Sequence, residues 1–215
     1  MEYKLTIALP KGKLFAPTVS LLARAGLNTL DLSDESRTLV FEDSQNRVRF
    51  IICRSTDIPT YVEYGAADLG IVGKDSIVEA GKNLYELVDL KYGYCRFVIA
   101  APSKDVPQEG EYPWKQGLRV ATKFPAIARE YLQKKGFQGE IIKLHGNVEL
   151  APRVGLSEVI VDLVSTGKTL RENDLSALDT ISEATARLVV NRASYRLKSR
   201  EINELVNKIR ENLSQ

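Results

Sequence analysis

Short apolar segments alternate with helix-period segments along most of the chain, and this alternation constrains the fold more than any other feature. Apolar runs typical of buried strands lie at residues 5–9, 48–53, 68–72, 96–101, 118–122, 141–144 and 159–164. Segments with helical periodicity lie between several of them, at residues 15–25, 58–64, 127–135 and 149–154. Strands and helices that alternate in this way form mostly parallel sheets. The sequence therefore predicts an α/β protein.

Two departures from the alternation predict that the chain forms two lobes. Residues 102–117 have the composition of a loop, and the strand before them follows the apolar segment 88–94 with no helix between the two. Residues 181–192 then alternate like one antiparallel strand, and an apolar stripe over 202–213 predicts a terminal amphipathic helix. We expect a first lobe from residues 1–90 and 176–215 and a second lobe from residues 91–175. The cleft between two such lobes is the expected ligand site.

Composition excludes several classes of partner. Lys and Arg number 30 against 28 Asp and Glu, and a net charge of +2 provides no basic field for nucleic acid. No apolar run reaches the ~18 residues of a membrane span, and the first residues lack the pattern of a signal peptide. Cys53 and Cys95 have neither metal-ligand nor redox spacing, as expected of thiols in a reducing compartment. We therefore expect a cytoplasmic protein that binds neither nucleic acid nor a membrane.

The most informative segment, residues 158–173, reads EVIVDLVSTGKTLREN. An apolar strand runs into Asp162, small residues follow, and a helix-compatible stretch begins near Thr169. Such a turn points backbone N–H groups and hydroxyls at one spot, which is how proteins hold a phosphate. The candidate ligand-binding residues are Asp162, Ser165, Thr166, Gly167, Lys168 and Thr169.

Two alternatives to a phosphate site accompany this segment. The fragment TGKT matches the end of a P-loop, but Asp162 stands where that motif requires a glycine, which disfavours a nucleoside triphosphate hydrolase. An acid at the strand end suits ribose hydroxyls and the turn suits a 5-phosphate, so the pattern favours a phosphoribosyl group. The other alternative, an ordinary strand-to-helix turn with a capping threonine, stays open.

Cationic residues follow other predicted strands. Lys11 and Gly12 come directly after the first strand, Arg54 follows the segment 48–53, and Arg37 precedes a further apolar run. Lys and Arg at strand ends can clamp a polyanion, although each alone is more often a solvated surface charge. Together they predict a diphosphate site. Glu149 begins a helix after a strand, where it serves either a ligand or the helix cap.

Several long motifs have a family. The segments LPKGKL, SRTLVF, CRSTDIPTYVEYGAADLGIVGKD, ATKFPAIAREYL, KLHGNVELAPRVGL and IVDLVSTGKTLREN resemble those of ATP phosphoribosyltransferases, in order, from Lys4 to about Arg196. The resemblance implies a fold like that of the periplasmic binding proteins. It also implies condensation of ATP, through adenine N1, with 5-phosphoribosyl diphosphate, the first step of histidine biosynthesis. A non-catalytic bilobal protein that binds small anions is the alternative.

The resemblance also carries expectations about form and partners. The chain has no room for the regulatory domain of the long form and is similar to the short, catalytic form, which works with a regulatory subunit like histidyl-tRNA synthetase. We expect a homodimer within a larger hetero-oligomer. Val161 precedes Asp162, where phosphoribosyltransferase loops ordinarily have two adjacent acids. We therefore expect Mg²⁺ to bind through substrate phosphates, with no metal ligand assigned in the chain. Arg54, Arg37 and Lys11 are the expected catalytic cations.

Overall fold

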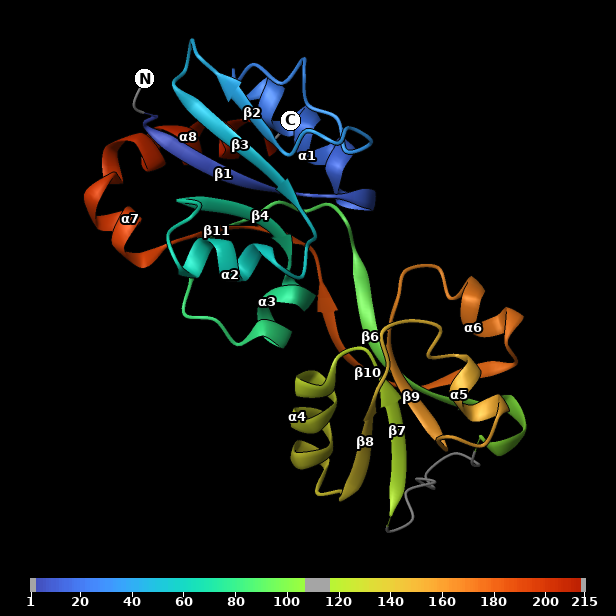
Figure 1. The fold of residues 1–215 in the computed structure, drawn as a ribbon. Helices are drawn as coiled ribbons and strands as arrows, with labels where there is room; N and C mark the ends of the chain where they lie inside the picture. Colours follow the sequence, from blue (N-terminus) through green and yellow to red (C-terminus); the bar gives the residue numbers. More distant parts are fainter. Residues whose placement is uncertain (1–2, 107–116, 214–215) are drawn as a thin grey trace. The chain divides into compact units, whose positions relative to one another are not determined.

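The computed structural model describes residues 3–106 and 117–213 and divides the chain into two compact units. Unit 1 contains Met1–Gly93 and Thr185–Gln215, and unit 2 contains Tyr94–Ala184. Each unit has its own mixed sheet with helices against it (Figure 1). The predicted α/β class is confirmed.

The sheet of unit 1 has the strand order β2-β3-β1-β4-β11-β5. Its strands are β1 (Leu5–Pro10), β2 (Val40–Asp43), β3 (Val48–Cys53), β4 (Leu69–Gly73), β5 (Tyr85–Asp89) and β11 (Ala186–Val190). β1 pairs in parallel with β3 and β4, whereas β2 and β11 run antiparallel to their neighbours. All six residues of β1 are buried, which is typical of a parallel strand covered on both faces. The carboxyl ends of β1, β3 and β4 therefore share one edge of the sheet.

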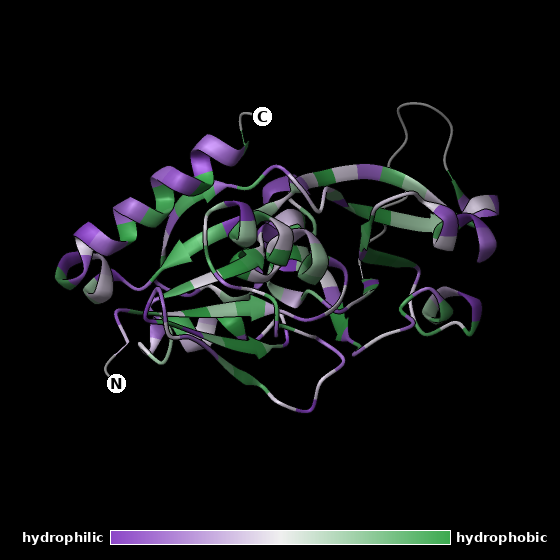
Figure 2. Ribbon diagram, turned by 90° about the horizontal axis from the view of Figure 1, so that it is seen from above, coloured by the Kyte–Doolittle hydropathy of each residue, from purple (hydrophilic) through white to green (hydrophobic). Residues whose placement is uncertain are grey.

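Helices cover both faces of this sheet. They are α1 (Phe15–Arg24), α2 (Ile58–Glu63), α3 (Lys74–Ala80), α7 (Arg192–Leu197) and α8 (Ser199–Leu213). The predicted amphipathic stripe of α8 is present, because Ile202, Leu205, Val206 and Ile209 are buried in the same apolar cluster as β1 and α1. Figure 2 shows this division of α8 into polar and apolar faces. Ile58 and Val62 of α2 belong to a second cluster, with Val72 and Val189 of the sheet.

Unit 2 has a five-stranded sheet in the order β10-β6-β9-β7-β8. Its strands are β6 (Cys95–Pro102), β7 (Leu118–Thr122), β8 (Gly139–Lys143), β9 (Val159–Val164) and β10 (Leu175–Ala184). β7, β8 and β9 are parallel, and β6 and β10 form an antiparallel pair beside β9. Its helices are α4 (Pro125–Lys135), α5 (Leu150–Arg153) and α6 (Lys168–Glu172).

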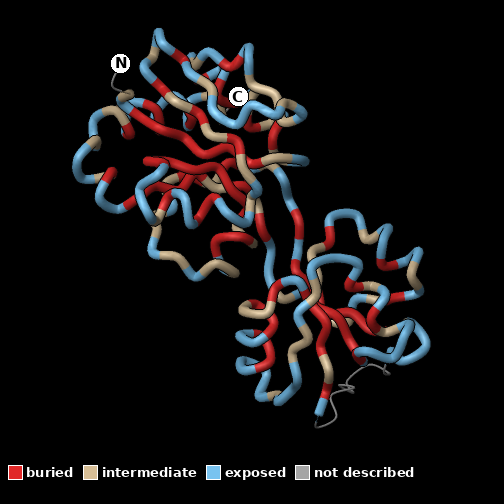
Figure 3. Tube along the Cα trace, viewed as in Figure 1, coloured by how far each residue is buried: buried red, intermediate tan, exposed pale blue. Residues whose placement is uncertain are grey.

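The two faces of this second sheet bury different residues. Phe97 and Val161 pack with α4, while Val98 and Ile160 pack with α5 and α6. Because successive side chains of a strand point to opposite faces, this alternation places α4 on one face and the two short helices on the other. The buried strands run through the middle of the unit in Figure 3. The three parallel strands thus end together at one edge, and short helices follow them.

The segment predicted as one antiparallel strand, residues 181–192, is divided between the two sheets. β10 pairs with β6 of unit 2, and β11 pairs with β4 and β5 of unit 1. Between them stands Thr185, whose hydroxyl donates to Asp89 Oδ1 at 2.7 Å and whose carbonyl accepts from the Lys74 N–H at 3.0 Å. The period of two continues through this change of sheet, so alternation alone does not reveal the break.

The boundaries of the units differ from those expected. The second crossing lies after Ala184 instead of residue 175, because β10 hydrogen-bonds to β6 over its length and belongs to unit 2. The first crossing lies after Gly93 instead of residue 90. Of the predicted loop at residues 102–117, Pro102 ends β6 and a short 3₁₀ helix covers Ser103–Asp105, while residues 107–116 lie outside the described residues. No helix in the described ranges combines the length and apolarity that crossing a membrane requires.

Candidate functional site

The turn after β9 holds six of the predicted ligand-binding residues. Asp162 lies within β9, two residues before the strand ends at Val164, and its side chain is half-buried. Ser165 and Thr166 are exposed, and α6 begins at Lys168. Gly167 has a φ of 72°, a left-handed conformation that glycine adopts without strain. The strand therefore fixes the acid, and the turn presents the small polar residues to solvent.

Hydrogen bonds within this turn distinguish it from an ordinary helix cap. The N-cap residue of α6 is Gly167, and no side chain caps the helix. The Lys168 N–H approaches Thr166 Oγ1 at only 3.4 Å, and Arg171 Nη1 donates to the Thr166 carbonyl at 3.3 Å. Because no threonine occupies the N-cap position, the structure does not favour the capping alternative.

Two charged residues share the edge of the sheet with Asp162. The register pairs Thr122 with Val161, so Lys123 and Asp162 come next on adjacent parallel strands. Glu149 is the N-cap residue of α5, but its side chain makes no capping hydrogen bond. The second interpretation of Glu149, a helix cap, is therefore not what the structure uses.

Asp162 has unusual electrostatics for an aspartate. Burial raises its pKa from 3.8 to about 6, and the charge of Glu149 raises the pKa further. The backbone N–H of Leu163 and the charge of Lys123 act in the opposite direction. A carboxylate that burial disfavours is a recognised mark of functional sites.

In unit 1, strand pairing brings the predicted cations to one edge of the sheet. Pro10 is paired with Cys53, and the Lys11 N–H donates to the Cys53 carbonyl at 2.9 Å, so Lys11 and Arg54 leave adjacent strands side by side. The Leu39 carbonyl accepts from the Ile52 N–H at 2.8 Å, which brings the chain that carries Arg37 to the same edge.

The side chains of these cations are not committed to ion pairs in the part of the chain that the structure describes. Arg37 and Arg54 are exposed, and Lys11 is half-buried. Burial raises the pKa of the neighbouring Cys53 thiol to about 11, which keeps the thiol neutral despite the charge of Lys11.

Gly12 differs from the prediction that its backbone is open to a ligand. Its N–H donates to Asp34 Oδ2 at 3.1 Å, and its φ is 81°. An acid of this chain therefore holds the position that a phosphate oxygen would take at Gly12. The sequence contains no local signal for this contact, because 22 residues separate the two partners.

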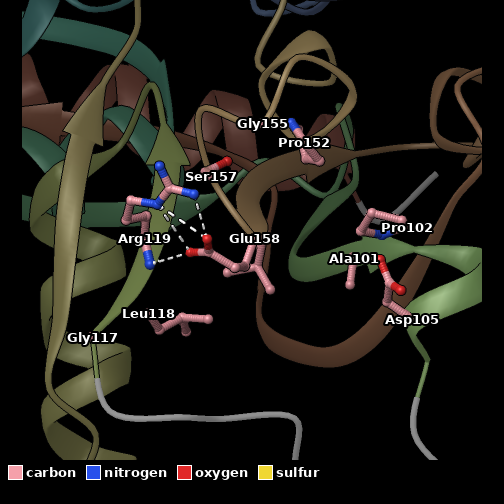
Figure 4. Close-up of a pocket in the computed structure, with 11 residues that line it drawn as sticks. Ala101, Pro102, Asp105, Gly117, Leu118, Arg119, Pro152, Gly155, Ser157 and Glu158 are labelled. Atoms are coloured by element: carbon pink, nitrogen blue, oxygen red, sulfur yellow. Dashed lines mark hydrogen bonds and ion pairs between the residues drawn. The ribbon is translucent and has the colours of Figure 1, made fainter.

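A pocket in unit 2 lies away from the predicted residues (Figure 4). Its volume is about 640 Å³, and its lining includes Leu118 and Val159, the first residues of β7 and β9. The Arg119–Glu158 ion pair borders it, with 3.1 Å between Arg119 Nε and Glu158 Oε1. This pocket lies at the edge of the sheet opposite Asp162 and is distinct from the candidate site.

The described residues contain no group of three or more His, Cys, Asp or Glu side chains arranged to hold a metal ion. The carboxylates at the candidate edge of unit 2 are Asp162 and Glu149. Mg²⁺ in phosphate sites is commonly held by one or two carboxylates together with substrate phosphates and water. This donor set therefore fits an ion that arrives with a phosphorylated substrate.

Known proteins are similar to the chain over nearly its whole length. The family model HisG, ATP phosphoribosyltransferase, matches residues 54–211. A relative named ATP phosphoribosyltransferase from Desulfitobacterium hafniense is 53% identical over 213 residues, with 96% of this chain and 95% of the relative covered. A relative of the same name from Moorella thermoacetica is 54% identical, with 94% and 90% covered.

Solved structures agree with these relatives. An ATP phosphoribosyltransferase (HisG:HisZ) complex from Thermotoga maritima has a chain with a TM-score of 0.83 and 33% identity, and the match covers 98% of both chains. A truncated arginine-bound ArgBP from T. maritima has a TM-score of 0.55 at 14% identity, with 99% and 96% covered, and this likeness concerns the fold alone. The resemblance found in the motifs is confirmed: the chain belongs to the ATP phosphoribosyltransferase family.

Proposed function

We propose that the chain transfers the phosphoribosyl group of 5-phosphoribosyl diphosphate to N1 of the adenine of ATP. The products are N1-(5-phosphoribosyl)-ATP and diphosphate, and the reaction opens histidine biosynthesis. The observation that carries the proposal is the turn after β9, where a half-buried acid precedes exposed hydroxyls and backbone N–H groups in a chain of this family. The length and coverage match the short, catalytic form of the family.

The turn after β9 is proposed to bind the phosphoribosyl group. Backbone N–H groups and the hydroxyls of Ser165, Thr166 and Thr169 suit the 5-phosphate, because phosphate oxygens accept hydrogen bonds. The ionised Asp162 accepts hydrogen bonds from ribose hydroxyls. Glu149 lies close enough to Asp162 to influence its charge and is proposed to bind the same sugar. Lys168 adds a positive charge, although it pairs with Glu172 at 3.6 Å.

The cations of unit 1 are proposed to bind diphosphate and triphosphate oxygens. Arg54 and Arg37 each offer a planar fork of N–H donors, and Lys11 offers a compact charge. In the reaction the bond from the anomeric carbon to the diphosphate oxygen breaks while the bond to adenine N1 forms, and negative charge builds on the leaving diphosphate. Fixed cations stabilise that charge without any need for a strong base. The Gly12 N–H joins them once the Asp34 carboxylate is displaced.

Mg²⁺ is proposed to accompany the substrate phosphates, where it neutralises part of their charge. Asp162 and Glu149 are the residues of unit 2 available to such an ion. We assign neither of them as a permanent metal ligand.

A regulatory partner is also proposed. The solved T. maritima relative is a complex of HisG with HisZ. We propose that this chain forms a homodimer that binds a regulatory subunit similar to histidyl-tRNA synthetase, and that it acts in the cytoplasm.

The alternative function, a non-catalytic anion-binding protein, is not favoured. The solute-binding proteins that share the fold are at most 16% identical to the chain, whereas named transferases exceed 50%. The deciding experiment mixes the chain and its partner subunit with ATP, 5-phosphoribosyl diphosphate and Mg²⁺ and measures diphosphate release. Release that requires both substrates supports the transferase. Tight binding of 5-phosphoribosyl diphosphate by calorimetry without any release would support the alternative.

A further inference from the structure

Lys123 occupies a position that the proposed mechanism has not used. It follows β7 directly, between Thr122, which is fully buried, and Phe124, which is 8% exposed. The Thr122 hydroxyl donates to the Val161 carbonyl at 2.7 Å and accepts from the Phe124 N–H at 2.9 Å. These two bonds tie the end of β7 to β9 and hold the backbone on both sides of Lys123. The lysine is therefore an exposed charge carried on a rigid support.

That support aims Lys123 at one neighbour. The parallel register continues from Thr122 and Val161 to Lys123 and Asp162, so their side chains leave adjacent strands toward the same face. Lys123 is exposed and forms no ion pair in the ranges that the structure describes. A lysine needed only for folding at this point would be expected to have a carboxylate partner.

The other charges around Asp162 do not supply the same effect. Glu149, from the start of α5, is negative and opposes ionisation of Asp162. On β6 the residue paired with Asp162 is Val98, which is uncharged. Lys168, on α6, pairs with Glu172. Lys123 is the positive charge that lowers the pKa of Asp162, whereas burial raises it more strongly.

We propose that Lys123 is a positioning residue that keeps the Asp162 carboxylate ionised and oriented toward the ribose of the substrate. This inference rests on the proposed phosphoribosyl site and adds a residue to it. Lys123 acts through Asp162, because the charge of a buried acid is set by its nearest opposite charge. The sequence motif ATKFP had drawn attention to this lysine only as the start of a helix.

The first test does not depend on substrate. In protein labelled with ¹³C at aspartate carboxyl groups, the Asp162 signal, assigned with Asp162→Asn, is titrated by NMR. Lys123→Met is expected to raise the Asp162 titration midpoint by about 0.5 to 1 pH unit, and Lys123→Arg is expected to leave it within about 0.2 unit. Lys143→Met is the matched control, because Lys143 ends the neighbouring strand β8 at the same edge. An unchanged midpoint in Lys123→Met overturns the inference whatever the protein binds.

The second test uses the substrate. Calorimetry measures the affinity for 5-phosphoribosyl diphosphate from pH 6 to 8.5 in the complete chain. Lys123→Met is expected to lose about fivefold in affinity near pH 6.5 and to recover most of that loss at pH 8.5, where Asp162 ionises without help. An equal loss at every pH overturns the positioning role, because it would mean direct contact with the substrate. If wild-type protein binds no 5-phosphoribosyl diphosphate, the proposed function fails while the NMR result still stands.

Discussion

Replacement of Asp162 by asparagine should make the protein more stable and its substrate site weaker. In the folded chain burial raises the pKa of Asp162 from 3.8 to about 6, so the folded state binds the proton more tightly than the unfolded state. Ionisation of Asp162 therefore costs folding free energy at neutral pH. Asparagine has nearly the same shape and carries no charge to bury.

The size of this cost follows from the two pKa values. Above pH 6 the cost is fully present and amounts to about 3 kcal/mol, and at pH 5 it has fallen to about 1.5 kcal/mol, because part of the folded population is protonated. It disappears as the pH falls through 3.8. Asp162→Asn should thus raise the free energy of unfolding by up to about 3 kcal/mol at pH 8 and by about half as much at pH 5.

Urea unfolding at pH 8, 7, 6 and 5, followed by circular dichroism, measures this difference. Amide exchange of β6 and β9 assigns the change to unit 2. Asp179→Asn is a control of opposite sign in the same unit. Although burial alone would raise the pKa of Asp179, hydrogen bonds from Lys135 and Tyr131 hold it below its usual value. That variant should lose stability at pH 8.

Two results would refute the reasoning about Asp162. One is a loss of stability in Asp162→Asn at pH 8 comparable with that of Asp179→Asn. The other is a gain that does not change with pH, which would point to packing instead of charge. Calorimetry with 5-phosphoribosyl diphosphate completes the test, since a stabilised variant with unchanged affinity would remove Asp162 from the site.

Three further substitutions test other parts of the structure. Arg54→Ala should lower kcat by about 30- to 1,000-fold, the loss of ~2–4 kcal/mol typical of a transition-state cation, with an unchanged Tm because the side chain is exposed; a kcat within a few-fold of wild type would exclude it. Gly167→Ala should weaken substrate binding and cost ~1 kcal/mol, because φ is 72° and Arg171 Nη1 lies 3.2 Å from the added Cβ; Gly136→Ala, with a φ of 74° and open space, should cost stability alone. Asp68→Asn should destabilise unit 1 by ~3 kcal/mol in urea unfolding, because buried Asp68 accepts hydrogen bonds from Thr6, Ser194 and Lys198; a change like that of exposed Glu204→Gln would contradict this role.

The parallel strands could be predicted from sequence because each is a continuous apolar run. The ranges 48–53, 118–122 and 159–164 coincide with β3, β7 and β9. The change of sheet at Thr185 could not be predicted in this way, because both β10 and β11 alternate and only their pairing partners differ. Register with a distant strand is a tertiary property that a local period does not contain.

The candidate site shows the same limit. The residue types of the turn after β9 were visible in the sequence, and so was the position of Arg54 after a strand. The contact of Asp34 with the Gly12 N–H and the tie from Thr122 to β9 join segments 22 and 39 residues apart. Hydrogen bonds of this kind depend on how loops return to a sheet edge, and composition at either end does not specify them.

The contrast between paired and unpaired charges gives the strongest structural argument for a polyanionic ligand. Charges that stabilise this fold have partners, as Lys198 has Asp68 at 2.8 Å and Lys135 has Asp179 at 2.9 Å. Among the described ion pairs none includes Arg37, Arg54 or Lys11, although all three lie at one edge of a sheet. Like charges that gather without a counter-charge repel one another, so folding alone gives no reason to bring them together. Bound diphosphate would supply the missing negative charge, and the three cations should then raise the Tm of unit 1 upon binding, an effect that Arg54→Ala should reduce and Lys198→Arg should leave in place.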